Sequence, residues 1–262
     1  MDQPYEISLE TQSVCNASCT FCPYPSLDRI GDRMPDELID KLINEMSEFT
    51  EPFVFAPFKV NEPLLDKRLI PICKEVEGKT CAEIRIFTNA SALTQIKVDE
   101  LSKLNRIKHL WVSLNSHHKS EYEELMGISF EKTVSNLDNL HRQNVFPVVV
   151  SSVGFPNYEF IQYCSERWPK FEPIVLKQDA WLDYADSQVG VVPDSPCSRW
   201  FELSIASSGI VTLCCMDGEG KYPIGDVREN TLLEVYNSPH WKDRRERMLS
   251  RREVPVCKTC TY

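Results

Sequence analysis

The stretch VCNASCTFCP, residues 14–23, places three cysteines on one short segment near the start of the chain. Cys15, Cys19 and Cys22 have the spacing C-x3-C-x2-C. Three thiolates this close together can hold three corners of a cubane iron–sulfur cluster and leave the fourth iron open. An open iron indicates chemistry at the cluster as well as electron storage. Structural zinc usually needs four donors in two separated pairs, and eleven cysteines is an odd number for disulfides, so the cluster interpretation is favoured.

The composition is that of a globular protein. The chain has 262 residues, enough for one large α/β domain or a domain plus a small appendage. It contains no run of about 18 apolar residues and no signal-like N-terminus, so we expect neither membrane insertion nor secretion. Reduced cysteines then fit the cytoplasm. The net charge of −10 argues against nonspecific binding to DNA or RNA, but a small anionic substrate could still occupy a local basic pocket.

Strand-like and helix-like patterns alternate from residue 5 to residue 182. The expected strands are Glu6–Gln12, Phe53–Val60, Glu83–Thr88, His109–Asn115, Pro147–Val153 and Pro173–Gln178. The expected helices are Pro35–Phe49, Lys67–Glu77, Thr94–Leu104, Ser120–Leu125, Phe130–Gln143 and Tyr158–Trp168. Six βα units in a row predict parallel strands with right-handed crossovers, either as a partial (β/α)6 TIM-like barrel or as an open doubly wound sheet. In a barrel, functional groups lie at the C-terminal ends of strands, and the cysteine stretch follows the first strand.

The pattern changes after residue 182. We expect the barrel over 1–182, a linker over 183–196 and a small C-terminal domain over 197–262. In that domain, a β-hairpin is expected over Phe201–Ala206 and Ile210–Cys215, followed by a helix over Leu232–Leu249.

A second set of cysteines lies in the C-terminal part: Cys197, Cys214, Cys215, Cys257 and Cys260. Cys257 and Cys260 form a chelating C-x2-C pair. Cys214 and Cys215 are expected on one strand, where neighbours point to opposite faces, so only one of them can easily face a shared site. Four ligands remain, which suffices for a cubane cluster or a zinc ion, and the spacing does not separate the two.

The first motif resembles the C-x3-C-x-aromatic-C motif of the radical S-adenosylmethionine (radical SAM) superfamily. The resemblance implies that the open iron binds the amino and carboxylate groups of S-adenosylmethionine (SAM) and that Phe21 packs near its adenine. The stretch KVNEP, residues 59–63, resembles the G-G-E-P motif with both glycines replaced, which implies cofactor contacts from Lys59 and Asn61 and an anchoring carboxylate at Glu62. At later strand ends the resemblance implies cofactor-binding roles for Thr88, Asn89, Ser113, Asn115 and Ser151.

The C-terminal pattern is similar to the twitch/SPASM extension of the same superfamily. It consists of Cys197, Gly209-x4-Cys214, the stretch IGDV at 224–227, and Cys257-x2-Cys260. The resemblance selects Cys214 over Cys215 and favours a second four-iron cluster over zinc, held by Cys197, Cys214, Cys257 and Cys260. Because the chain ends two residues after Cys260, we expect the shorter twitch form with one auxiliary cluster.

Taken together, these resemblances imply a radical SAM oxidoreductase with two [4Fe-4S] clusters and SAM. Such an enzyme cleaves SAM reductively to a 5′-deoxyadenosyl radical, abstracts a substrate hydrogen and passes an electron to the auxiliary cluster. We expect a small-molecule substrate such as a sugar or aminocyclitol, and a flavodoxin- or ferredoxin-type reductant. Lys177 or Asp179, at the end of the sixth strand, could deprotonate or orient a substrate hydroxyl or amine.

Two alternatives stay open. One is a radical SAM enzyme that modifies peptides or proteins. The 14 residues before Cys15 leave no room for a leader-binding domain, which a separate chain could supply. The other is a non-enzymatic iron–sulfur or zinc protein.

Overall fold

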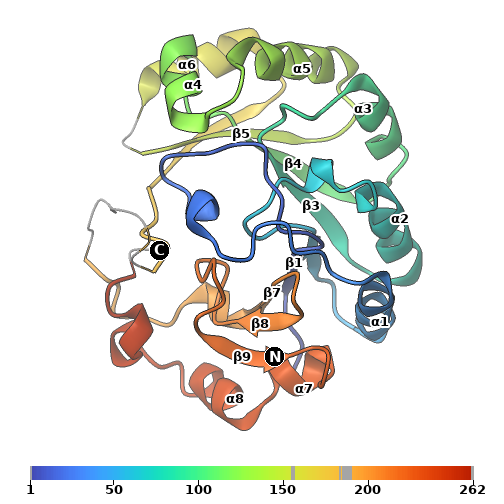
Figure 1. Cartoon of the computed structure of the whole chain (residues 1–262), viewed down its shortest axis with the longest axis vertical. Helices are drawn as coiled ribbons and strands as arrows, with labels where there is room; N and C mark the ends of the chain where they lie inside the picture. The colour runs from blue at the N-terminus through green and yellow to red at the C-terminus, as the bar shows by residue number, and fades with distance from the viewer. Residues whose placement is uncertain (1, 155–156, 183, 185–190, 261–262) are drawn as a thin grey trace.

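The computed structural model describes residues 2–154, 157–182, 184 and 191–260. In this part of the chain the strands form one sheet, in the order β6-β5-β4-β3-β2-β1-β7-β8-β9 (Figure 1). The expected alternating strands are present as β1 (Glu6–Leu9), β2 (Val54–Ala56), β3 (Glu83–Thr88), β4 (Ile107–Ser113), β5 (Val148–Val153) and β6 (Glu172–Leu176). Each pairs with the next in parallel. The sheet is open, so the predicted α/β fold with a partial TIM-like barrel is confirmed.

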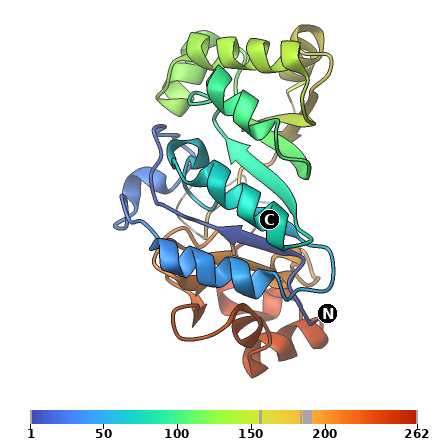
Figure 2. The ribbon, with the colours of Figure 1, turned by 90° about the vertical axis from the view of Figure 1, so that its right-hand side faces the viewer.

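Helices cover the outer side of this curved sheet, as Figures 1 and 2 show. They are α1 (Asp36–Met46), α2 (Leu69–Lys79), α3 (Gln95–Leu101), α4 (Lys119–Met126), α5 (Phe130–Gln143) and α6 (Tyr158–Arg167). In α1 the buried residues Ile39, Leu42, Ile43 and Met46 recur at helical spacing and pack against the sheet. The side chains of Thr94, Ser129 and Asn157 cap α3, α5 and α6.

The C-terminal part extends the same sheet. β7 (Glu202–Ile205) pairs in parallel with β1, and β8 (Ile210–Thr212) and β9 (Pro223–Asp226) continue it antiparallel. Leu203 and Ile205 share one hydrophobic core with Ile7 and Leu9. The sheet therefore runs without a break across the expected linker, of which residues 183 and 185–190 lie outside the described residues.

Two expectations for this part are wrong. The strand expected to run through Cys215 ends at Thr212, and both Cys214 and Cys215 lie in the turn after β8. The single helix expected over 232–249 is two helices, α7 (Leu232–Tyr236) and α8 (Pro239–Glu246). Pro239 offers no backbone N–H, and Ser238 before it takes an extended ψ of 141°, which ends the first helix.

Among the described residues, no helix is long and apolar enough to span a membrane.

Candidate active site

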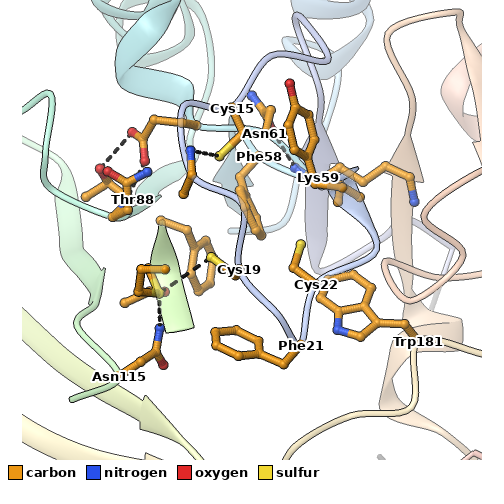
Figure 3. A pocket seen from close by; sticks show the side chains of 18 residues that line it. Cys15, Cys19, Phe21, Cys22, Phe58, Lys59, Asn61, Thr88, Asn115 and Trp181 are labelled. Atoms are coloured by element: carbon orange, nitrogen blue, oxygen red, sulfur yellow. Dashed lines mark hydrogen bonds between the residues drawn. The ribbon is translucent and has the colours of Figure 1, made fainter. Parts of the chain in front are cut away.

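The first three cysteines face one pocket at the C-terminal ends of the strands. Cys15, Cys19 and Cys22 line it together with Phe21 (Figure 3). Their loop is fastened to the end of α4, where Ser18 N donates to Met126 O and Thr20 N to Leu125 O, both at 3.0 Å. The sequence-predicted grouping of the three thiols is thus present in the structure.

Gly127 lets the cysteine loop approach α4 this closely. It ends the helix with φ +68°, and a Cβ added there would lie 2.1 Å from Ser18 Oγ. Both the left-handed backbone and the close contact favour glycine at this position.

The thiols of this pocket are poor acids without a metal. Burial raises the pKa of Cys15 to about 12 and that of Cys22 to about 11, and it raises the pKa of Cys19 as well. Negative charge on the neighbouring groups adds to the effect at Cys15 and Cys19. Thiolates here therefore need positive charge beside them, which the irons of a cluster supply. Three converging, half-buried thiols fit three corners of a four-iron cluster.

Glu62 forms the second wall of the pocket. Its buried carboxylate accepts hydrogen bonds from Thr88 Oγ1 and Asn89 N, each at 2.7 Å, and from Leu64 N at 3.1 Å. Burial raises the pKa of Glu62, and these donors oppose that rise. The carboxylate is held rigidly but has no cationic hydrogen-bond partner among the described residues.

Asn61 carries an unused donor in the same pocket. Its Oδ1 accepts from Lys59 N at 3.0 Å, whereas its buried Nδ2 has no hydrogen-bond partner in the described part of the chain. The Glu62 carboxylate can accept from an amino group, and the unpaired Asn61 Nδ2 can donate to a carboxylate. The two residues therefore suit a ligand with adjacent amino and carboxylate groups, as SAM has.

Of the other residues predicted to contact the cofactor, four line the pocket and one does not. Thr88, Asn89, Ser113 and Asn115 line it. Ser151 is buried, accepts from Trp111 Nε1 at 3.0 Å and donates to Val112 O, so its hydroxyl is occupied within the sheet. Its role as a cofactor contact stays a prediction.

Lys59 lines the pocket with its stem, but Figure 3 shows its side chain running away toward the C-terminal strands. There Nζ donates to Ser204 Oγ, Thr212 Oγ1 and Cys214 O at 3.3, 3.0 and 3.4 Å. The ammonium therefore serves partners other than a ligand in the first pocket.

The two residues predicted to be catalytic differ in burial. The side chain of Lys177 is exposed, whereas that of Asp179 is half-buried. Burial raises the pKa of Asp179, and the nearby Arg199 lowers it. Neither residue lines the first pocket, although Trp181, two residues further on, does.

Four thiols of the second set line a separate small pocket. They are Cys197, Cys214, Cys257 and Cys260, the four that were expected. Cys215 does not line it. Burial raises the pKa of the Cys215 thiol to about 11. Four converging thiols fit a four-iron cluster or zinc, so the geometry agrees with the spacing.

Sequence reasoning missed a group of residues on the concave face of the sheet. Ile84, Ile86, Leu110 and Val112 pack under the helices, so Arg85, Phe87, His109 and Trp111 face the other side. Arg85 and His109 are cross-strand neighbours, and Arg85 Nε and His109 Nε2 are buried without a hydrogen-bond partner in the described residues. Phe58, Phe87 and Trp111 stack beside them, with ring centroids 4.9 and 5.5 Å apart. The period-2 pattern of β3 and β4 was the available signal.

Comparisons with known proteins agree with this geometry. A model described as the Radical SAM superfamily matches residues 9–161, and one described as SPASM, an iron–sulfur cluster-binding domain, matches residues 197–261. The comparison with curated proteins gives no match. The layout of the two cysteine sets resembles that of 2-deoxy-scyllo-inosamine dehydrogenase, a short radical SAM enzyme with a twitch domain.

Solved structures share the fold. BtrN in complex with AdoMet and 2-DOIA has a TM-score of 0.69 and 18% identity, over 100% of this chain and 95% of that one. SuiB from Streptococcus suis, bound to precursor peptide SuiA, has a TM-score of 0.74 and 15% identity, over 99% of this chain and 70% of that one. For anSMEcpe with bound AdoMet the TM-score is 0.72 and the identity 13%, over 94% of this chain and 82% of that one.

Proposed function

The chain belongs to the radical SAM superfamily, and we propose that it is a small-molecule oxidoreductase of that superfamily. It is an enzyme that uses a [4Fe-4S] cluster and SAM as cofactors. Its C-terminal domain belongs to a type that binds auxiliary iron–sulfur clusters. The observation that carries the proposal is the presence of two thiol sets: three thiols in a pocket with spare ligand-binding groups, and four thiols in a pocket of their own.

In this proposal Cys15, Cys19 and Cys22 hold the first cluster. Glu62 and Asn61 bind the amino and carboxylate groups of SAM, and Phe21 lies beside the adenine. When bound, the cluster and SAM supply a 5′-deoxyadenosyl radical and methionine at the expense of one electron from the reductant, for which we propose a flavodoxin or ferredoxin. The protein's part is to hold the substrate in reach and to exclude water.

Cys197, Cys214, Cys257 and Cys260 would hold the auxiliary cluster, which then has no iron open to substrate. Such a cluster suits electron transfer. The overall change that we propose is a two-electron oxidation of the substrate, for example of an alcohol to a carbonyl. One hydrogen atom leaves to form 5′-deoxyadenosine, one proton goes to a base, and one electron goes to the auxiliary site. Asp179 and Lys177 are our candidates for the base, and Asp179 is favoured because its carboxyl is half-buried.

The side chains on the concave face of the sheet favour a small polar molecule as the substrate. Arg85 Nε and His109 Nε2 have no hydrogen-bond partner in the described residues, while Arg85 Nη1 pairs with the buried Glu6 Oε2 at 2.8 Å. Phe87 and Trp111 offer ring faces beside them. Burial and the charge of Arg85 lower the pKa of His109, so its imidazole is neutral near pH 7. Hydrogen-bonding groups beside aromatic rings suit a polyhydroxylated or aminated ring, as in a sugar or aminocyclitol.

A peptide-modifying enzyme is the second candidate, because the fold matches that of SuiB bound to its precursor peptide. For either candidate we infer a reducing compartment such as the cytoplasm, since two thiol sets must stay reduced to bind metal.

The test is substrate oxidation by the anaerobically reconstituted enzyme with SAM and a strong reductant. Sugars and aminocyclitols form one panel and peptides the other, and products are followed by mass spectrometry. Arg85→Met should lower product formation while 5′-deoxyadenosine still forms. Lys108→Met is the matched control. It also removes a cation from an ion pair on the same sheet, but the pair of Lys108 with Glu83 is exposed. Turnover of peptides alone, or an unaffected Arg85→Met variant, would contradict the small-molecule proposal.

A further inference from the structure

Lys59 is a buried lysine with no assigned task. It follows β2 in the loop that ends at Glu62, and its exposed fraction is 0%. Its backbone N–H donates to Asn61 Oδ1 in the first pocket, while its Nζ reaches the turn that carries Cys214. One residue thus contacts the surroundings of both thiol sets.

The partners of Nζ are those of an ammonium group. Ser204 Oγ, Thr212 Oγ1 and Cys214 O surround it, and an ammonium has three N–H donors. Thr212 Oγ1 already directs its own hydrogen toward Ser204 O and Cys214 O, so it can only accept from Lys59. Three acceptors around one nitrogen match a protonated lysine.

This cation is not neutralised by a direct ion pair within the described residues. The buried carboxylate of Glu10 pairs with Arg29, and Arg29 also donates to Gly218 O at 2.6 and 2.9 Å. Glu10 accepts from Ser207 N as well. These contacts join Arg29, which follows the first three cysteines, to Gly218 in the turn that follows Cys214 and Cys215. Glu10 is therefore occupied by other donors, and the ammonium of Lys59 stays beside Cys214 O.

A cation in this position would stabilise the reduced form of a cluster held by Cys214. The auxiliary cluster gains one unit of negative charge on reduction, and a buried positive charge close to it stabilises that state more than it would in water.

We propose that Lys59 is a positioning residue that fixes the Cys214 turn and raises the reduction potential of the auxiliary cluster. This inference rests on the proposed function, since it requires an iron–sulfur cluster at the second thiol set. It assigns Lys59 to the electron acceptor instead of to SAM.

The test is a redox titration of the holoenzyme followed by electron paramagnetic resonance, with and without SAM. The signal that changes on SAM addition belongs to the first cluster, and the other to the auxiliary cluster. Lys59→Met removes the charge and keeps the stem, and Lys59→Gln keeps a hydrogen-bond donor without charge. Ser204→Ala is the matched control, because it removes one acceptor of Lys59 and leaves the charge in place.

In both Lys59 variants the ratio of reduced to oxidised auxiliary cluster at a fixed potential should fall at least tenfold, a shift of about 59 mV for one electron. The first cluster and the Ser204→Ala variant should change much less. Loss of only the auxiliary iron from a folded Lys59 variant would also support the positioning role. An unchanged potential, or failure of both Lys59 variants to fold, would overturn it in favour of a purely structural lysine. Zinc at the second site of the unmodified enzyme would instead overturn the proposed function itself.

Discussion

Replacing Cys214 and Cys215 separately with alanine tests the second metal site residue by residue. The two cysteines are adjacent in one turn, yet only Cys214 lines the pocket with Cys197, Cys257 and Cys260. Cys214→Ala removes one of four ligands, so iron should fall from about eight to about four per chain. Product formation should stop, whereas some 5′-deoxyadenosine should still form, because the first thiol set is in a different pocket.

Cys215→Ala is the matched control. Its thiol is half-buried, and removing one sulfur atom from it should cost about 1 kcal/mol of unfolding free energy without loss of iron. The assay is iron content together with 5′-deoxyadenosine and product formation in both variants. If Cys215→Ala loses the second set of irons and Cys214→Ala keeps it, the ligand assignment is inverted. If neither variant loses iron, the turn does not belong to the metal site.

Three further predictions concern the first pocket and its supports. Gly127→Ala should lower the unfolding free energy of the metal-free protein by at least about 1–2 kcal/mol, because of its φ of +68° and because the new Cβ would contact Ser18 Oγ. Gly78→Ala, at an exposed position of α2, should raise it by about 0.5–1 kcal/mol, and equal effects in urea unfolding would contradict this. Glu62→Gln should leave iron content unchanged but weaken SAM binding about tenfold or more in equilibrium dialysis. The substitution removes a charge and turns an amide N–H toward a buried donor, Thr88 Oγ1 or Asn89 N. Unchanged affinity would exclude Glu62 from the SAM site. Cys19→Ala should abolish 5′-deoxyadenosine formation with a strong reductant, and a rate equal to that of the unmodified enzyme would refute the cluster assignment.

The local patterns of the sequence were enough to predict six parallel βα units and two groups of cysteines, whereas the partial barrel and the choice of Cys214 over Cys215 came from the family resemblance. β3 and α5 have the bounds that alternation and helical periodicity indicate, because each buries one regular face. The cysteines were recognisable because metal ligands on one loop need close spacing.

Long-range contacts explain what the sequence did not show. The pairing of β7 with β1 depends on residues almost 200 positions apart, and no local pattern encodes it. Lys59 lines the first pocket as the motif predicts, but the direction of its side chain depends on Thr212 and Ser204 on distant strands. Cys214 and Cys215 were placed on a strand because their apolar neighbours suggest one, whereas Asp217 accepts from three backbone N–H groups and stabilises a turn there.

The central claim is that the two thiol sets hold one four-iron cluster each. Analysis of iron, sulfide and zinc in the anaerobically reconstituted protein tests it most directly. We predict about eight irons and about eight sulfides per chain with no stoichiometric zinc. About four irons per chain with one zinc would contradict the auxiliary cluster, and with it the electron-transfer role of the C-terminal domain.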